Sequence, residues 1–166
     1  MTDMNFIRTL ISFVMLSALM GCGSGKQEFI PLDHMTFTNS YDKNKVKISV
    51  YVLIANPDAD HMKLKTSVIQ YVKKRLQGND YIKKTSVSSI NFVFYQKNRN
   101  TFYFIDHNEE NNKLNSNEIS HYPEDYIANY NVVKCDGGFA EKIYLFDRPE
   151  EIVSSNCNES SLNTKK

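Results

Sequence analysis

Apolar and polar residues alternate most regularly between Lys45 and Ile54, where valine and isoleucine occupy every second position. This period of two predicts a β-strand. The second half of the segment is apolar at consecutive positions, which predicts a central strand with a helix packed on one side. Two hairpins are also predicted: 86–95 with 101–106, and 130–135 with 139–146, the second turning at Asp136-Gly137-Gly138.

A helical period follows the first predicted strand. Leu64, Val68, Val72 and Leu76 recur at every fourth position and form one apolar stripe. Asn56-Pro57 is predicted to begin the helix, and Gly78 to end it in a left-handed conformation. The order of elements predicts an α+β domain, a mostly antiparallel sheet of about five strands with one main helix packed on a face.

A longer apolar run precedes this domain. Thr9 to Met20 carry no charge and are mostly apolar, with Arg8 in front of them. A helix of this length rises about 18 Å, well short of the roughly 30 Å of hydrocarbon that a spanning helix crosses. The run is therefore predicted to be a signal peptide that is cleaved between Gly21 and Cys22.

The leader ends in Leu19-Met20-Gly21-Cys22. This segment resembles the lipobox of bacterial lipoproteins, which has an aliphatic residue, a tolerant position, a small residue and a cysteine. The resemblance implies that Cys22 becomes the acylated first residue of the mature chain and anchors it in a membrane, facing the periplasm. Two or more acyl chains hold firmly, because each buried methylene contributes about 0.8 kcal/mol. An ordinary secretory leader with a chance cysteine, or an uncleaved anchor, is the alternative.

The residues after Cys22 bear on the choice of membrane. In bacterial lipoproteins an aspartate at this place is the usual signal for retention in the inner membrane, whereas Gly23 and Ser24 stand here. Glycine leaves both membranes open, with the inner one slightly favoured. The chain is thus predicted to consist of a signal peptide (1–21), a lipidated tether (22–34), an α+β domain (35–148) and a polar C-terminal tail (149–166).

Composition restricts the classes of partner. The net charge is +1, which gives no support to nucleic-acid binding. Beyond Cys22 there are two cysteines, Cys135 and Cys157, an even pair in a compartment that favours disulfides. A bond between them closes a loop of about 20 residues and adds roughly 3 kcal/mol of stability on the chain-entropy model. The alternative is that Cys135 is a reactive thiol.

Patterns for metal binding and catalysis are weak. Asp106, Asn108 and Glu110 suit the first positions of a calcium loop, but Asn111 replaces the required glycine and Asn117 the bidentate glutamate. The four histidines, His34, His61, His107 and His121, have no zinc-site spacing. The sequence has no nucleophile elbow or phosphate-binding loop. We therefore predict no metal, no cofactor and no enzymatic activity.

The chain as a whole resembles small lipoproteins encoded in enterobacterial prophages, through its leader and its α+β body rich in tyrosine and asparagine. The resemblance implies an envelope lipoprotein that binds another envelope protein or reports envelope stress. Overproduction in that family induces a periplasmic protease through a two-component system. Two alternatives stay open, a periplasmic immunity or exclusion module, and a periplasmic hydrolase that depends on Cys135 or His121.

Overall fold

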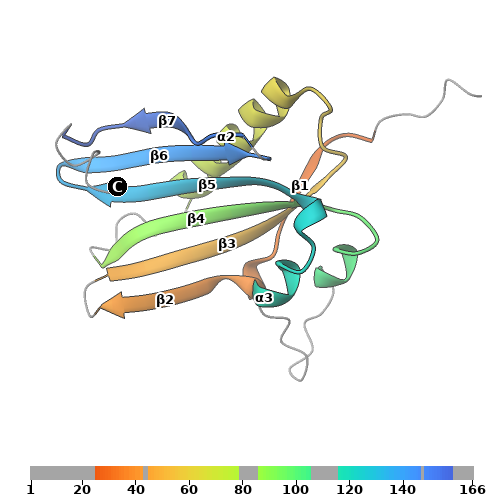
Figure 1. The fold of residues 1–166 in the computed structure, drawn as a ribbon, viewed down its shortest axis with the longest axis horizontal. Helices are drawn as coiled ribbons and strands as arrows, with labels where there is room; N and C mark the ends of the chain where they lie inside the picture. Colours follow the sequence, from red (N-terminus) through yellow and green to blue (C-terminus); the bar gives the residue numbers. More distant parts are fainter. Residues whose placement is uncertain (1–24, 43–44, 79–85, 106–115, 147, 159–166) are drawn as a thin grey trace, which may run out of the picture.

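The structure, a computed structural model, describes residues 25–42, 45–78, 86–105, 116–146 and 148–158. These residues form one sheet with one long helix on a face, so the predicted α+β class is confirmed. The sheet has seven strands instead of about five, and its strand pairs are antiparallel except for one (Figure 1).

The strands are β1 (Glu28–Pro31), β2 (Phe37–Asp42), β3 (Lys45–Ala55), β4 (Val87–Gln96), β5 (Tyr126–Cys135), β6 (Gly138–Leu145) and β7 (Glu151–Ser155). Their order in the sheet is β1-β3-β4-β5-β6-β7. β2 also pairs with β3, along a different stretch of that strand from β1. β3 and β4 are parallel, because the chain returns from the end of one to the start of the other through the helix α2 (His61–Gln77). Their carboxyl ends therefore lie at the same end of the sheet.

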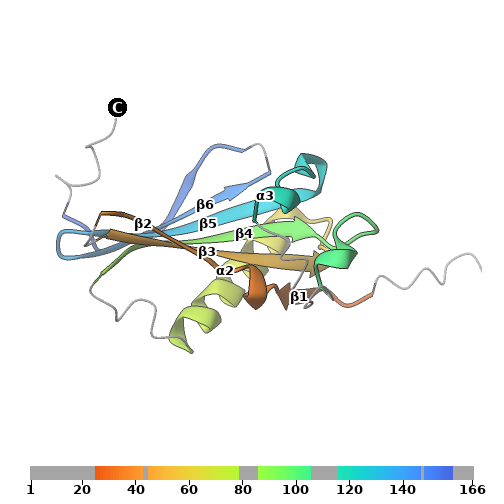
Figure 2. The same ribbon diagram turned by 90° about the horizontal axis from the view of Figure 1, so that it is seen from below.

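Alternation along β3 and β4 divides the core into two layers. We call the face covered by α2 the helix face and the opposite face the second face; Figure 2 shows α2 beneath the strands. The predicted apolar stripe of α2 packs on the helix face. That face holds Ile48, Val50, Val52 and Ile54 of β3 and Ile90, Phe92 and Phe94 of β4. The second face holds Leu53 of β3 and Val93 and Tyr95 of β4.

The helix α2 begins at His61, later than the predicted start at Pro57. Asp60 is the N-cap, and its carboxylate accepts hydrogen bonds from the N–H groups of Met62 at 2.9 Å and Lys63 at 3.3 Å. These two bonds hold the pKa of Asp60 below its ordinary value. A carboxylate that reaches two free N–H groups of the first turn explains why the helix begins here.

The residues predicted to bound α2 have other conformations. Asn56 has a φ of 49°, in the left-handed region, and turns the chain out of β3. Asparagine tolerates this region better than most residues because of its short polar side chain. Gly78 has a φ of −85°, so the predicted left-handed stop is wrong. Its N–H still bonds to the carbonyl of Lys74 at 3.3 Å, which continues the helical pattern.

Short helical segments cover one end of the second face. They are η1 (Asp33–Met35), η2 (Phe102–Phe104), α3 (Ser116–Ile119) and η3 (Pro123–Asp125). Met35, Phe104 and Ile119 are buried there against the strands. The return strand predicted from Thr101 is wrong, and η2 lies in its place. β4 pairs with β3 on one side and β5 on the other, so it has no open edge for a hairpin partner.

Polar side chains occupy much of the rest of the second face. Asn91 of β4 pairs across the sheet with Asn131 of β5, and Asn129 lies opposite Val93. The Oδ1 atoms of Asn91 and Asn129 are buried and accept no hydrogen bond from the described residues. This part of the sheet therefore contains polar groups that the fold leaves unsatisfied.

The sheet extends past both predicted boundaries of the domain. β1 lies in the segment predicted to be a tether (22–34), and β7 in the segment predicted to be a tail (149–166). β1 has four residues and ends at Pro31, too short a segment to show the alternation that predicts a strand. The structural domain is therefore wider than 35–148.

The predicted hairpin of β5 and β6 is present and turns at Asp136-Gly137. Gly137 has a φ of 90°, which favours glycine because a side chain is strained there. The structure also has the predicted disulfide, which joins Cys135, at the end of β5, to Cys157, just after β7. It holds β7 at the end of the sheet opposite the carboxyl ends of β3 and β4 (Figure 1).

Candidate functional site at the carboxyl ends of the parallel strands

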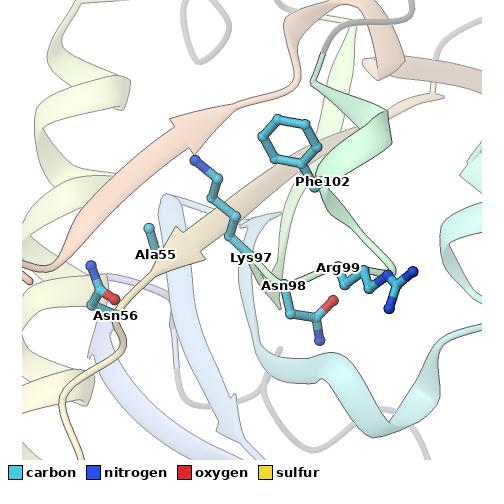
Figure 3. A pocket seen from close by; sticks show the side chains of 6 residues that line it. All are labelled: Ala55, Asn56, Lys97, Asn98, Arg99 and Phe102. Atoms are coloured by element: carbon cyan, nitrogen blue, oxygen red, sulfur yellow. The ribbon is translucent and has the colours of Figure 1, made fainter.

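An open pocket of about 440 Å³ lies where β3 and β4 end. Its lining residues come from the end of β3 and from the segment after β4: Ala55, Asn56, Lys97, Asn98, Arg99 and Phe102 (Figure 3). Ligands of open sheets often bind outside the carboxyl ends of parallel strands, where the loops that follow the strands meet. The parallel pairing of β3 and β4 creates such a meeting point here.

Hydrogen bonds fix the loop that follows β4. The Oδ1 atom of Asn98 accepts from the N–H groups of Asn100 at 2.8 Å and Thr101 at 3.1 Å. The hydroxyl of Thr101, which is fully buried, donates to the carbonyl of Gln96 at 2.6 Å and accepts from the N–H of Asn98 at 3.0 Å. These side-chain bonds close the turn, so the residues on both sides of Asn98 are held at the rim of the pocket.

A buried carboxylate supports the same loop. Asp125 of η3 is 6% exposed and accepts hydrogen bonds from the side-chain amides of Asn98 and Asn100. Neither Lys97 nor Arg99 forms an ion pair with another residue in the part of the chain that is described. Since neutral amides occupy the carboxylate of Asp125, the two cations at the rim remain available to an anionic ligand.

A cation and an aromatic ring stand together at this rim. The Nζ atom of Lys97 lies 5.5 Å from the centroid of the Phe102 ring, a distance typical of a cation–π contact (Figure 3). The N–H of Lys97 bonds to the carbonyl of Ile54 at 2.8 Å, which ties this residue to the end of β3. The ring of Phe102 is half exposed. The pocket therefore combines positive charge with exposed apolar surface.

Several residues singled out by the sequence lie outside the described part of the chain. They are the cleavage and lipidation residues Gly21 and Cys22, the sorting residues Gly23 and Ser24, and residues 106–111 of the calcium-like pattern, which include His107. The described chain begins at Gly25, three residues after Cys22. Among the described helices, none has the length and apolar character that a membrane span requires.

The other candidate side chains are dispersed. His34 and His121 are exposed, whereas His61 lies 2.7 Å from Arg148, measured from Nδ1 to Nη2. Within the described ranges no three His, Cys, Asp or Glu side chains gather closely enough to hold a metal ion. Because Cys135 is bonded to Cys157, its sulfur is not a free thiol in this structure.

The sequence pattern predicts no binding role for the pocket residues, and Asn56 is expected only to begin the helix. It predicted that 96–100 is a hairpin turn, and the available signal was two cations, Lys97 and Arg99, directly after an apolar strand. Asn56 belongs to the site only because β3 and β4 run parallel, a pairing that the residue pattern does not reveal.

Comparison of this chain with models of protein families, with curated proteins and with solved structures finds no match in any of the three.

Proposed function

We propose that this protein is a lipid-anchored lipoprotein of the bacterial envelope whose domain binds another envelope component and catalyses no reaction. The observation that carries the proposal is the short interval between the lipobox-like sequence and the domain. Only Gly23 and Ser24 separate Cys22 from Gly25, which lies against the side chain of Asn56 in the domain. Three residue steps span at most about 11 Å, so an acylated Cys22 would hold the domain directly at the membrane surface.

The pocket supports a binding role. Its lining residues offer two cations, two amides and one aromatic ring, which can recognise charge and shape. None of them is a carboxylate, a histidine, a cysteine or a hydroxyl residue, the groups that most often act as nucleophiles or general acids and bases. Binding without catalysis is therefore the function that these residues favour.

Cys22→Ser tests the anchor. The substitution removes the sulfur that would carry the lipid, so metabolic labelling with palmitate should be lost and the unprocessed precursor should accumulate. The matched control is Cys135→Ser combined with Cys157→Ser, which removes the disulfide sulfurs and should leave labelling intact. Normal labelling of the Cys22→Ser protein would contradict the proposal.

The resemblance to prophage-encoded lipoproteins adds a second part, induction of an envelope stress response by excess acylated protein at the inner membrane. Overproduction should therefore raise a periplasmic-protease reporter. Gly23→Asp, which favours inner-membrane retention, should keep this induction, whereas Gly23→Ser should lower it. Equally raised reporter levels in both variants would contradict the requirement for the inner membrane. If neither variant raised the reporter, the immunity or exclusion alternative would be favoured.

A further inference from the structure

Gly25 and Lys26, the residues that join the domain to the predicted tether, lie against the pocket. The Nδ2 atom of Asn56 donates a hydrogen bond to the carbonyl of Lys26 at 3.4 Å. A Cβ atom built on Gly25 would lie 2.5 Å from the same nitrogen, so the first described residue is in close contact with the Asn56 side chain. Asn56 also lines the pocket. The end of the molecule that leads to Cys22 is therefore also the end that carries the pocket.

The covalent reach of the tether limits how far this end can move from the membrane. Three residue steps between Cys22 and Gly25 allow at most about 11 Å. Electrostatic attraction to a charged surface extends over a Debye length of roughly 8–10 Å at physiological salt. The reach of the tether is thus comparable to the Debye length, so an anchored domain can bring the pocket within range of the charge on the headgroups.

The charge at the pocket suits an anionic surface. Lys97 and Arg99 line the pocket without a carboxylate among its lining residues, and Lys26 adds a cation where the domain joins the tether. Three carboxylates lie nearby: Asp125 accepts hydrogen bonds from the Asn98 and Asn100 side chains, Glu28 is opposite Ala55 in the sheet, and the N–H of Asp58 bonds to the side chain of Gln27 at 3.0 Å. The described lining of the pocket thus carries cations and no carboxylate, while the carboxylates lie behind or beside it.

The exposed ring of Phe102 completes an amphipathic pair with Lys97. An aromatic ring beside a lysine suits the boundary between headgroups and acyl chains, where the ring leaves water while the ammonium group stays at the level of the phosphates. Figure 3 shows the Lys97 side chain beside the Phe102 ring, with Asn56 on one side and Arg99, whose guanidinium points outward, on the other. This arrangement presents two kinds of contact to one surface.

From these contacts we infer that the pocket at the ends of β3 and β4 docks onto anionic phospholipid headgroups of the membrane that anchors the chain, an inference that rests on the proposed lipid anchor. Lys97 and Arg99 bind the phosphates, and Phe102 enters the boundary beneath them. Docking fixes the orientation of the domain, with the Cys135–Cys157 end pointing away from the membrane.

A tryptophan reporter tests the orientation. The chain contains no tryptophan, so Phe102→Trp gives one reporter at the pocket. Phe37→Trp is the matched control, because Phe37 is 49% exposed and Phe102 is 50% exposed. Phe37 pairs with Ser49, about 20 Å back along β3 from Ala55 at 3.3 Å per residue. The full-length lipidated protein is purified from bacterial membranes and reconstituted into vesicles of phosphatidylethanolamine and phosphatidylglycerol.

In these vesicles the emission of Phe102→Trp should shift to the blue and be quenched by brominated acyl chains, while Phe37→Trp keeps a water-exposed spectrum. Equal behaviour of the two reporters would overturn the orientation. Replacing phosphatidylglycerol with phosphatidylcholine should abolish the shift, and a shift that persists would overturn the requirement for anionic headgroups.

The cations are tested in the Phe102→Trp protein. Lys97→Gln with Arg99→Gln should lower the ratio of docked to undocked domain roughly fivefold for each cation removed. Lys73→Gln with Lys74→Gln, two exposed lysines on α2, is the control and should have no effect. An unchanged shift without Lys97 and Arg99 would overturn the headgroup site. Circular dichroism checks that each variant is folded.

The two proposals fail in different ways. A chain without the lipid anchor would not incorporate into any vesicle, which would contradict the proposed function. A chain that incorporates but shows no shift at position 102 would contradict only the docking site.

Discussion

The two faces of the sheet differ in what covers them and in what their side chains do. The helix face is apolar along its length, and its buried phenol, Tyr130, donates a hydrogen bond to the carboxylate of Glu141. Burial is the main cause that raises the pKa of Tyr130, and this hydrogen bond raises it further. The second face has an apolar cluster only at the pocket end, and elsewhere presents polar residues such as Asn91 and Asn129.

The difference indicates a division of labour within the same strands. Successive side chains of a strand point to opposite faces, so the sequence of β4 specifies both layers at once. The helix face gains stability from burial of apolar area, although the Tyr71 hydroxyl there finds no partner among the described residues. On the second face the same holds for the amide oxygens of Asn91 and Asn129, and each such group costs about 1–3 kcal/mol. Four variants test this comparison, from the largest expected effect to the smallest.

Phe94→Ala should have the largest effect. Phe94 is fully buried on the helix face, with its ring 6.1 Å from Phe29 and 6.0 Å from Tyr71 between centroids. Removal of the ring leaves a cavity and should lower the free energy of unfolding by about 3–5 kcal/mol. The control is Val93→Ala, its neighbour on the second face, with an expected loss of about 2 kcal/mol or less. Urea denaturation measures both, and equal losses would contradict the comparison.

Loss of the disulfide should have the next largest effect. Cys135→Ser with Cys157→Ser opens a loop with a sequence separation of 22 and should cost about 3 kcal/mol, mainly through the entropy of the unfolded chain. The bond also holds β7, whose Val153 packs against the helix-face core. The reduced wild-type protein should unfold at the same urea concentration as the variant. A wild-type midpoint unaffected by reductant would show that the bond does not stabilise the domain.

Asn91→Val should act in the opposite direction. Asn91 lies next to buried residues in β4, and its buried Oδ1 atom accepts no hydrogen bond from the part of the chain that the structure describes. Valine removes this unsatisfied oxygen and suits a strand, so the free energy of unfolding should stay the same or rise by up to about 1 kcal/mol. Thr101→Val is the contrasting variant. It should lower the free energy of unfolding, because the Thr101 hydroxyl donates one hydrogen bond and accepts another. A clear destabilisation by Asn91→Val would indicate that the second face contributes to stability.

The smallest effect should come from Glu150, which interacts with second-face residues. Two hydrogen bonds lower the pKa of Glu150 below its ordinary value of 4.5, and the bond from Lys142 has a larger effect than the bond from Tyr144. A lowered folded pKa means that the contribution to stability is present above the ordinary pKa and is lost as the pH falls through the folded one. The stability difference between wild type and Glu150→Gln should therefore be greatest near neutral pH and vanish in acid. Urea midpoints across this range measure it, and a difference that grows in acid would contradict the sign.

Part of this structure follows from short-range patterns. Leu64, Val68 and Val72 face the core because a period of four places them on one side of any helix. The hairpin at Gly137 follows similarly, since the required backbone angle favours glycine. The sequence also predicted the partner of Cys135, because only one other cysteine remains when Cys22 is assigned to the lipid.

Pairing between distant segments was decided only by the tertiary structure. Phe102 to Phe104 are apolar and aromatic, as a strand would be, yet they form η2 because both edges of β4 are already occupied. Glu28 to Pro31 form a strand only because β3 offers them an edge. Lys97 and Asn56 meet because α2 makes β3 and β4 parallel. Local periodicity determines which residues are buried. Which strand edges pair depends on the whole sheet, and the parallel pairing of β3 with β4 places the pocket residues together.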